Sequence, residues 1–389
     1  MEQNYGLVLA GGGTRGAFEV GACKALSELN IRIKGIVGTS IGAINGALLF
    51  QDDYPKMEQI YRSIEPSDIF TIHHPIDTTK DLLSIHNIRA LVKEFVRSQG
   101  LNNQPLRKMM EANIDTEKIY QSDKDFGLVA FSINDLAPVE LFKEDIPQDE
   151  LIDFILASAC YPIFKPQHVQ DKQFIDGGIY DVAPINMLIR KGYRKILVVD
   201  LTDGGALRKL EKKDGIYVKM IRPSEDLGGG FEFNQQRIQK NINLGYLDTL
   251  KEFHHLQGHN YYFTNDSFNQ VLQYLSLNMI YGLEFAAELL GIERLQIFDA
   301  EVFLYEVAHE YQKAKNEYDF VNDKGFFGEL LRNPKLITKI DDLKSLLVWF
   351  EERILSQPNF KVPSPIGKIF EDFVTAGRAI IELNNILKV

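Results

Sequence analysis

The chain has 389 residues, of which 45% are hydrophobic and 25% charged, the ordinary composition of a globular protein. Lys and Arg number 43 and Asp and Glu 54, giving a net charge of −11, which disfavours a nucleic-acid binder that relies on bulk positive charge. Two cysteines, Cys23 and Cys160, exclude a disulfide framework and a cysteine-rich zinc site. They suit a reducing compartment.

The N-terminus has no basic start and only a short apolar run at residues 6–10, so the sequence does not predict a signal peptide. Two uncharged stretches, 35–51 and 267–283, are shorter than the roughly 20 apolar residues that span a bilayer. We therefore expect a cytoplasmic protein without a membrane anchor.

Residues 5–200 alternate between apolar runs and helical patterns. The first buried strand is expected at 6–10, a helix at 17–29, a second strand at 35–38 and a second helix at 41–50. Further strands are expected at 126–133, 173–175 and 195–201. This alternation predicts an α/β fold with a parallel or mixed sheet that is covered on both faces.

The second half of the chain has a different pattern. Residues 202–230 have loop character, and the stretch 190–222 carries ten Lys and Arg against four Asp and Glu. Beyond residue 250 helical spacing dominates. One amphipathic helix is predicted from an apolar stripe with residues 351–353 largely off it: Leu336, Ile340, Leu343, Leu346, Leu347, Phe350 and Ile354. We expect two domains, 1–250 and a mainly helical 251–389.

The first chemical motif is a glycine loop between a strand and a helix: Gly11, Gly12, Gly13, Thr14, Arg15 and Gly16. Consecutive glycines turn backbone N–H groups toward one point, where they bind a phosphate or a transient oxyanion. The pattern also fits a dinucleotide loop, which requires an acid about 20 residues further on. The nearest acid, Glu28, lies inside the predicted helix. A nucleotide role and a purely structural turn remain alternatives.

The second motif is Gly38-Thr39-Ser40-Ile41-Gly42, a G-x-S-x-G pattern between a buried strand and an apolar helix. That context is typical of a nucleophile elbow, in which a strained turn presents the serine at a helix N-terminus. The flanking Gly38 and Gly42 leave room for the turn. Ser40 is therefore the candidate nucleophile, and a small-residue turn without chemistry is the alternative.

A serine hydroxyl needs a base. None of the histidines stands in a clear strand-end loop with an acid to orient it: His73, His74, His86, His168, His254, His255, His259 and His309. We place His168 in a loop and His254 and His255 in a polar helical stretch. Asp176 ends a short apolar strand and precedes Gly177 and Gly178, and an apolar site would raise its pKa toward that of a useful base. Asp203, before two glycines, is less favoured because its surroundings are basic.

These motifs together resemble the patatin-like phospholipase family. The glycine loop at 11–16 is similar to the family's oxyanion-hole loop, 38–42 to its nucleophile elbow, and 176–178 with Pro184 to its aspartate loop. Residues 157–164 resemble the segment ahead of the aspartate, and 245–248 a further family element. The resemblance covers about residues 5–250.

The resemblance implies a three-layer α/β/α sandwich in which residues 1–250 form the catalytic domain. It implies that Ser40 attacks an acyl ester of a lipid, that Asp176 is the base, and that N–H groups of the glycine loop hold the oxyanion. No metal or cofactor is implied. The C-terminal region has no assigned role.

Several alternatives stay open at this point. The protein could be a Ser–His–Asp esterase, or a lipid-binding scaffold that keeps the pocket without turnover. Arg15 could meet a lipid phosphate or anchor its own loop. The basic stretch 190–222 could make transient contact with anionic membranes, although a run of charge is more often a solvated face.

Overall fold

The computed structural model describes residues 4–71, 81, 100–202, 207–211, 213–318, 343–362 and 367–388. The chain forms two compact units, Met1–Thr249 and Leu250–Val389, called unit 1 and unit 2 below. Some residues weighed above lie outside the described ones: Asp203 with its two glycines, His73, His74 and His86, and Leu336 and Ile340.

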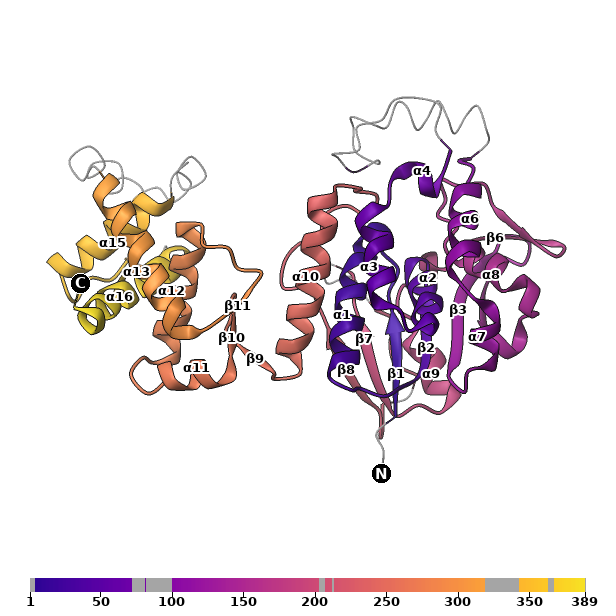
Figure 1. Ribbon diagram of the computed structural model, residues 1–389, viewed down its shortest axis with the longest axis horizontal. Coiled ribbons are helices and arrows are strands. Elements are labelled where there is room, and N and C mark those ends of the chain that lie inside the picture. Colours follow the sequence, from indigo (N-terminus) through magenta and orange to yellow (C-terminus); the bar gives the residue numbers. More distant parts are fainter. Residues whose placement is uncertain are drawn as a thin grey trace. The chain divides into compact units, whose positions relative to one another are not determined.

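Unit 1 is built on an eight-stranded sheet (Figure 1). Its strands are β1 (Tyr5–Leu9), β2 (Ile33–Thr39), β3 (Asp125–Ser132), β4 (Ala137–Phe142), β5 (Gln167–Val169), β6 (Lys172–Asp176), β7 (Lys195–Val199) and β8 (Tyr217–Ile221). The order is β5-β6-β3-β2-β1-β7-β8, and β4 also pairs with β3. The five strands from β3 to β8 along this order are parallel, whereas β4, β5 and β6 join by antiparallel pairing.

The helices of unit 1 include the two that the sequence predicts at 17–29 and 41–50, which are α1 and α2. They are η1 (Gly13–Gly16), α1 (Ala17–Glu28), α2 (Ile41–Leu48), η2 (Leu49–Gln51), α3 (Tyr54–Ser63), α4 (Pro66–Ile69), α6 (Gln104–Asn113), α7 (Thr116–Gln121), η3 (Lys143–Asp145), η4 (Gln148–Glu150), α8 (Leu151–Ser158), η5 (Gly177–Ile179), α9 (Ile185–Lys191) and α10 (Gln235–Glu252).

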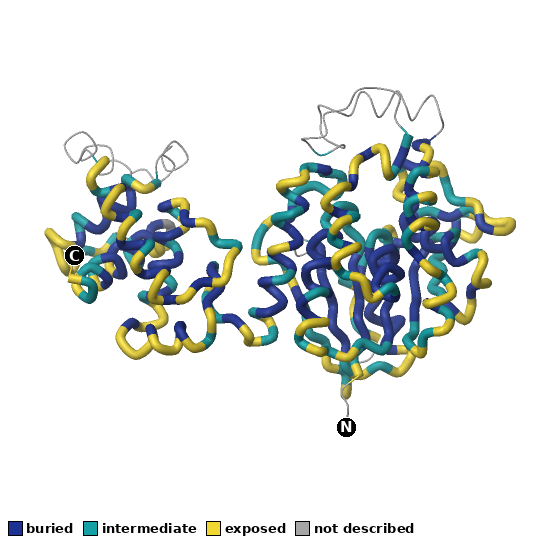
Figure 2. The backbone as a smooth tube through the Cα atoms, in the orientation of Figure 1, coloured by how far each residue is buried: buried dark blue, intermediate teal, exposed yellow. Residues whose placement is uncertain are grey.

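Helices cover both faces of the sheet. A Cβ built on Gly46 of α2 would lie 3.1 Å from the side chain of Ile36, and one built on Gly6 would lie 2.7 Å from Leu188 of α9. Ile36 pairs with Leu7, the neighbour of Gly6. Because successive strand residues point to opposite faces, α2 and α9 lie on opposite sides. The predicted three-layer α/β fold is confirmed, and the central strands of the sheet are buried along most of their length (Figure 2).

Three strands of unit 1 are absent from the sequence prediction. All six residues of β4 are only half-buried, and β5 has three residues. In β8, Tyr217 is exposed, Ile221 is buried and the three residues between them are half-buried. None of them contains the continuous apolar run that marks a central parallel strand. Placing His168 in a loop was therefore wrong, since it lies in β5, and the loop assignment of 202–230 was wrong for β8.

Several basic side chains of the stretch 190–222 form ion pairs with acids of the same unit. Arg190 forms ion pairs with Glu140 and Glu211, and Lys191 lies 3.2 Å from Glu144. Arg222 lies 3.2 Å from the buried Asp200. These pairs account for part of the local excess of positive charge. Membrane contact through this stretch stays a prediction.

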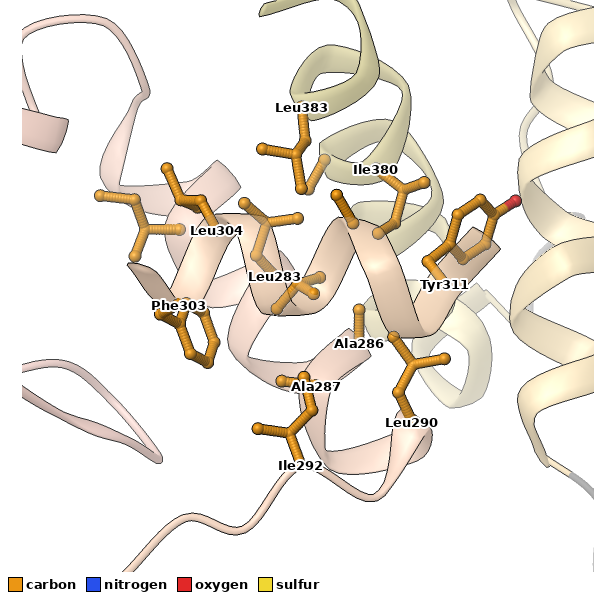
Figure 3. Close-up of a cluster of buried hydrophobic side chains, with 14 of the residues drawn as sticks. Leu283, Ala286, Ala287, Leu290, Ile292, Phe303, Leu304, Tyr311, Ile380 and Leu383 are labelled. Atoms are coloured by element: carbon orange, nitrogen blue, oxygen red, sulfur yellow. The ribbon is translucent and has the colours of Figure 1, made fainter. Parts of the chain in front are cut away.

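Unit 2 combines a three-stranded sheet with helices. The strands are β9 (Leu256–Gln257), β10 (Tyr262–Thr264) and β11 (Ile297–Phe298), and the helices are α11 (Asn265–Val271), α12 (Leu277–Leu290), α13 (Ala300–Glu317), α15 (Leu343–Ser356) and α16 (Gly367–Leu387). Apolar side chains of α12, α13 and α16 meet in its core, with Leu283, Phe303 and Ile380 among them (Figure 3). No described helix has the length and apolar character needed to cross a bilayer.

The predicted amphipathic helix coincides in part with α15. Leu346, Leu347 and Phe350 are buried as expected. Glu351, which the stripe leaves largely outside, is buried as well, and Lys315 of α13 donates to it at 3.1 Å. His254 and His255 follow the last residue of α10 and lie in a turn, so the helical placement of both was wrong.

Candidate active site

Ser40 stands in a sharp turn between β2 and α2. Its φ of 57° and ψ of −124° form a backbone conformation that non-glycine residues rarely adopt and that costs of order 1–3 kcal/mol. Packing enforces the turn from both sides. A Cβ on Gly38 would lie 2.3 Å from the carbonyl carbon of Gly42, and one on Gly42 would lie 2.2 Å from the carbonyl oxygen of Leu9. Only glycine fits at either position.

Asp176 lies across the sheet from Ser40 because β3 separates their strands. Thr39 of β2 pairs with Val129, and Asp176 of β6 pairs with the next residue, Ala130. Both side chains therefore emerge at the same level of the sheet. Ser40 Oγ donates a hydrogen bond of 2.5 Å to Asp176 Oδ2, although the two residues are 136 positions apart.

The surroundings of Asp176 raise its pKa. The residue is 4% exposed, and this burial raises the pKa of its carboxyl group to about 6. The hydrogen bond from Ser40 and a 2.7 Å bond from the Gly178 N–H to Oδ1 oppose the shift by stabilising the carboxylate. A Cβ on Gly177 would lie 2.2 Å from the Val129 carbonyl oxygen, which explains the first glycine of this loop.

The glycine loop adjoins Ser40, since a Cβ on Gly11 would lie 3.4 Å from the Ser40 Cβ. The Gly11 N–H donates to Val182 O at 2.9 Å, and the Arg15 N–H donates to Gly12 O at 3.3 Å. The N–H groups of Gly12 and Gly13 have no acceptor among the described residues, and both glycines line the cavity beside Ser40. These two N–H groups are thus the available donors of the loop, whereas Gly16 is buried behind it.

A second glycine loop, Gly228 to Gly230 between β8 and α10, accepts hydrogen bonds from the first. Thr14 donates through its N–H to Gly230 O at 2.8 Å and through its hydroxyl to Gly229 O at 3.2 Å. Arg15 Nε donates to Gly228 O at 2.7 Å, so this side chain anchors its own loop. The sequence shows three consecutive glycines here, but only the structure reveals their contact with the first loop.

The last residue of α8 and the residues just after it accept hydrogen bonds from the backbone of both Ser40 and Asp176. The Ser40 N–H donates to Ser158 Oγ at 3.0 Å, and the Asp176 N–H donates to Cys160 O at 2.8 Å. Ser158 is fully buried. In the sequence, only the resemblance to a family segment marks residues 157–164, and it predicts no role for Ser158.

An apolar cavity of about 500 Å³ opens beside Ser40 and Asp176. Its walls come mainly from aliphatic and aromatic side chains: Ile41, Ile44, Leu48, Ile60, Tyr61, Ile64, Ile69, Leu106, Met109, Tyr161, Phe164, Ile179, Val182, Phe231 and Phe233. Its size and polarity are typical of small-molecule sites. None of the described histidines lines it, and His168 is exposed on β5.

Known proteins resemble parts of this chain. Over 50 residues, 13% of the chain, it is 58% identical to the lysophospholipase nte1 of Aspergillus terreus. Over 196 residues, 49% of the chain, it is 26% identical to the probable lipid hydrolase 463L of Invertebrate iridescent virus 6. The solved structure of VipD from Legionella pneumophila aligns with a TM-score of 0.42 and 14% identity, covering 97% of this chain and 90% of VipD.

The match to the curated relatives is partial on their side too. It spans 3% of the length of the fungal protein and 64% of the viral one. Residues 7–189, which contain the glycine loop, Ser40 and Asp176, match the model of patatin-like phospholipases. These residues therefore belong to the patatin-like phospholipase family.

Proposed function

We propose that this protein hydrolyses acyl esters of lipids, with Ser40 as the nucleophile and Asp176 as its general base. The 2.5 Å hydrogen bond between them, beside an apolar cavity of about 500 Å³, is the observation that carries the proposal. The names lysophospholipase and lipid hydrolase among the relatives support a lipid ester as the substrate. Catalysis is assigned to unit 1.

Asp176 suits the role of base because its pKa lies near neutrality. A carboxylate with an ordinary pKa is a weak base for a serine hydroxyl. Burial raises the pKa of Asp176 to about 6, which narrows the gap between the pKa of the carboxyl group and that of the hydroxyl. At neutral pH the group is still mostly ionised. It therefore accepts the hydroxyl proton without a histidine between them.

In the first half of the reaction, Ser40 Oγ attacks the ester carbonyl carbon while its proton passes to Asp176. The carbonyl π electrons move to oxygen, and the N–H groups of Gly12 and Gly13 donate to the resulting oxyanion. When the intermediate collapses, the ester C–O bond breaks. The departing alcohol takes the proton from Asp176, and the acyl group stays on Ser40.

In the second half, Asp176 takes a proton from a water molecule that attacks the acyl-enzyme carbonyl. The same two N–H groups hold the second oxyanion. Its collapse breaks the bond to Ser40 Oγ, which regains a proton from Asp176, and the fatty acid leaves. Throughout, the apolar walls hold the acyl chain away from water, which adds a favourable free energy of about 0.8 kcal/mol per buried CH₂.

The direct test is mass spectrometry of the products formed from a mixed lipid extract. Wild-type protein is expected to release free fatty acid and the matching deacylated lipid, and Ser40→Ala to release neither. Equal product from both proteins would refute Ser40 as the nucleophile. Binding of lipid without release by either protein would favour a non-catalytic scaffold.

A further inference from the structure

A buried polar cluster lies directly behind the glycine loop. It consists of Glu19 on α1, Asn45 on α2 and Tyr61 on α3, which are at most 3% exposed. Asn45 lies five residues after Ser40 on α2, the helix that follows the turn at Ser40. Asn45 and Tyr61 belong to the cavity wall, but their polar atoms bond within the cluster rather than into the cavity.

The amide of Asn45 is fixed in one orientation. Its Nδ2 donates to Glu19 Oε2 at 2.8 Å and to Gly16 O at 3.1 Å, which uses both amide hydrogens. Its Oδ1 accepts from the Tyr61 hydroxyl at 3.0 Å. A flipped amide would place its oxygen against two acceptors. The bond to Gly16 is therefore specified by the whole cluster.

Gly16 is the last residue of η1, the turn that begins at Gly13. Its own position is tightly confined, because a Cβ on Gly16 would lie 2.6 Å from the side chain of Ile41 and 2.6 Å from the Tyr61 hydroxyl. Since η1 is a single short turn, fixing the Gly16 carbonyl fixes the direction of the Gly13 N–H at its other end. On the outer side, the Gly228–Gly230 loop holds Thr14 and Arg15.

We propose that Asn45 is a positioning residue that ties the nucleophile helix to the oxyanion-holding turn. Through Gly16 it sets where the Gly12 and Gly13 N–H groups point relative to Ser40. The inference rests on the proposed function. It adds that the spacing between nucleophile and oxyanion donors depends on one buried amide whose hydrogen bonds go to Glu19, Tyr61 and Gly16.

The test separates binding of an oxyanion from binding of an acyl chain. An alkyl trifluoromethyl ketone is attacked by Ser40 to give a hemiketal, in which the O–C bond forms, the carbonyl oxygen becomes the oxyanion and the serine proton passes to Asp176. A fatty acid of the same chain length binds the cavity without forming a bond to Ser40. The ratio of their inhibition constants therefore reports the oxyanion donors.

For Asn45→Ala we expect inhibition by the ketone to weaken by about 10- to 100-fold, less than the 10²–10³ that loss of a whole donor costs. The kcat for a soluble ester falls by a similar factor, whereas inhibition by the fatty acid and the KM change little. Glu19→Gln keeps an oxygen to accept from Asn45, so it is expected to stay near the wild-type ratio.

A folded Asn45→Ala protein that keeps wild-type inhibition by the ketone would overturn the proposal, as would an equal loss toward ketone and fatty acid. If Asn45→Ala does not fold, Asn45→Ser serves as the second variant. The serine hydroxyl is one bond shorter than the amide and does not reach the Nδ2 position, so the hydrogen bond to Gly16 O is lost. Absence of Ser40-dependent hydrolysis in the wild type would instead refute the proposed function, and this inference with it.

Discussion

Glu284 of unit 2 and Asp176 of unit 1 are both buried carboxylates, but they bind different kinds of hydrogen-bond donor. Glu284 of unit 2 is fully buried and accepts the backbone N–H groups of His259 and Tyr261 at 2.9 Å and 2.8 Å, besides that of Asn260. Asp176 of unit 1 accepts one backbone N–H and one serine hydroxyl. Burial raises the pKa of both groups.

The difference lies in the donors. A backbone amide cannot give up its proton at ordinary pH, so the three N–H groups that Glu284 accepts hold a loop in place and cannot act as nucleophiles. A serine hydroxyl can transfer its proton when an electrophile approaches, and the cavity beside Ser40 leaves space for one. Burial and a raised pKa alone therefore do not distinguish a catalytic carboxylate from a structural one.

The largest expected effect is on the rate of the Asp176→Asn variant. An asparagine keeps the shape of the side chain but cannot accept the Ser40 proton, so kcat should fall by about 10²- to 10⁴-fold. Hydrolysis of a p-nitrophenyl ester measures it, with thermal unfolding as the check on folding. A rate equal to wild type would remove Asp176 from the mechanism. Retained activity in Asp176→Asn together with loss in a histidine variant would instead favour a Ser–His–Asp esterase.

The next effect is on the stability of unit 1. In Gly42→Ala the new methyl group would meet the Leu9 carbonyl oxygen at 2.2 Å, and overpacking of this kind costs about 1–3 kcal/mol or more. Gly46→Ala, one turn later on the same helix, is the matched control. Its methyl group would lie 3.1 Å from Ile36, whose side chain can adjust. Denaturant unfolding should show a clear loss for the first variant only; equal losses would contradict the packing argument.

Glu284→Gln is expected to affect stability without affecting the chemistry. Its amide group would replace one oxygen that now accepts backbone N–H groups, at a cost of about 1–3 kcal/mol for donors left unpaired. Urea unfolding measures the loss of stability, and hydrolysis of a p-nitrophenyl ester by the variant and by the wild type compares their kcat values. A drop in kcat for the folded variant would show that unit 2 takes part in catalysis and that Glu284 is more than a structural carboxylate.

The smallest effect is that of pH on the wild-type rate. Asp176 acts as a base only when ionised, so kcat/KM should fall about tenfold per pH unit below a pKa of about 6. Asp181 also has a raised pKa of about 6 but faces Arg208 at 3.7 Å, so Asp181→Asn should leave the position of this limb unchanged. A limb near pH 4 would mean that Asp176 is not desolvated in the working enzyme.

The central part of the fold can be read from the sequence because buried parallel strands leave continuous apolar runs. The runs at β1, β2 and β7 are of this kind, and the glycine motifs follow two of them. Edge and antiparallel strands leave a weaker signal. β4 is half-buried along its length, and β9 and β11 have two residues each, too few for any periodicity.

The candidate site is predictable to the same extent. Ser40, Asp176 and the glycine loop lie in motifs whose local chemistry is recognisable. Ser158, Asn45 and Gly228 act through contacts with residues 29 to 213 positions away. No local pattern of sequence encodes such partners, so only the folded chain shows that they surround the same turn.

Covalent labelling with an alkyl fluorophosphonate, followed by peptide mass spectrometry, tests most directly whether Ser40 and Asp176 work as a pair. We expect one adduct, on the peptide that contains Ser40, and much slower labelling in Asp176→Asn although that variant is folded. An adduct on another residue, or equal labelling rates in the two proteins, would contradict the assignment of Ser40 and Asp176 as nucleophile and base.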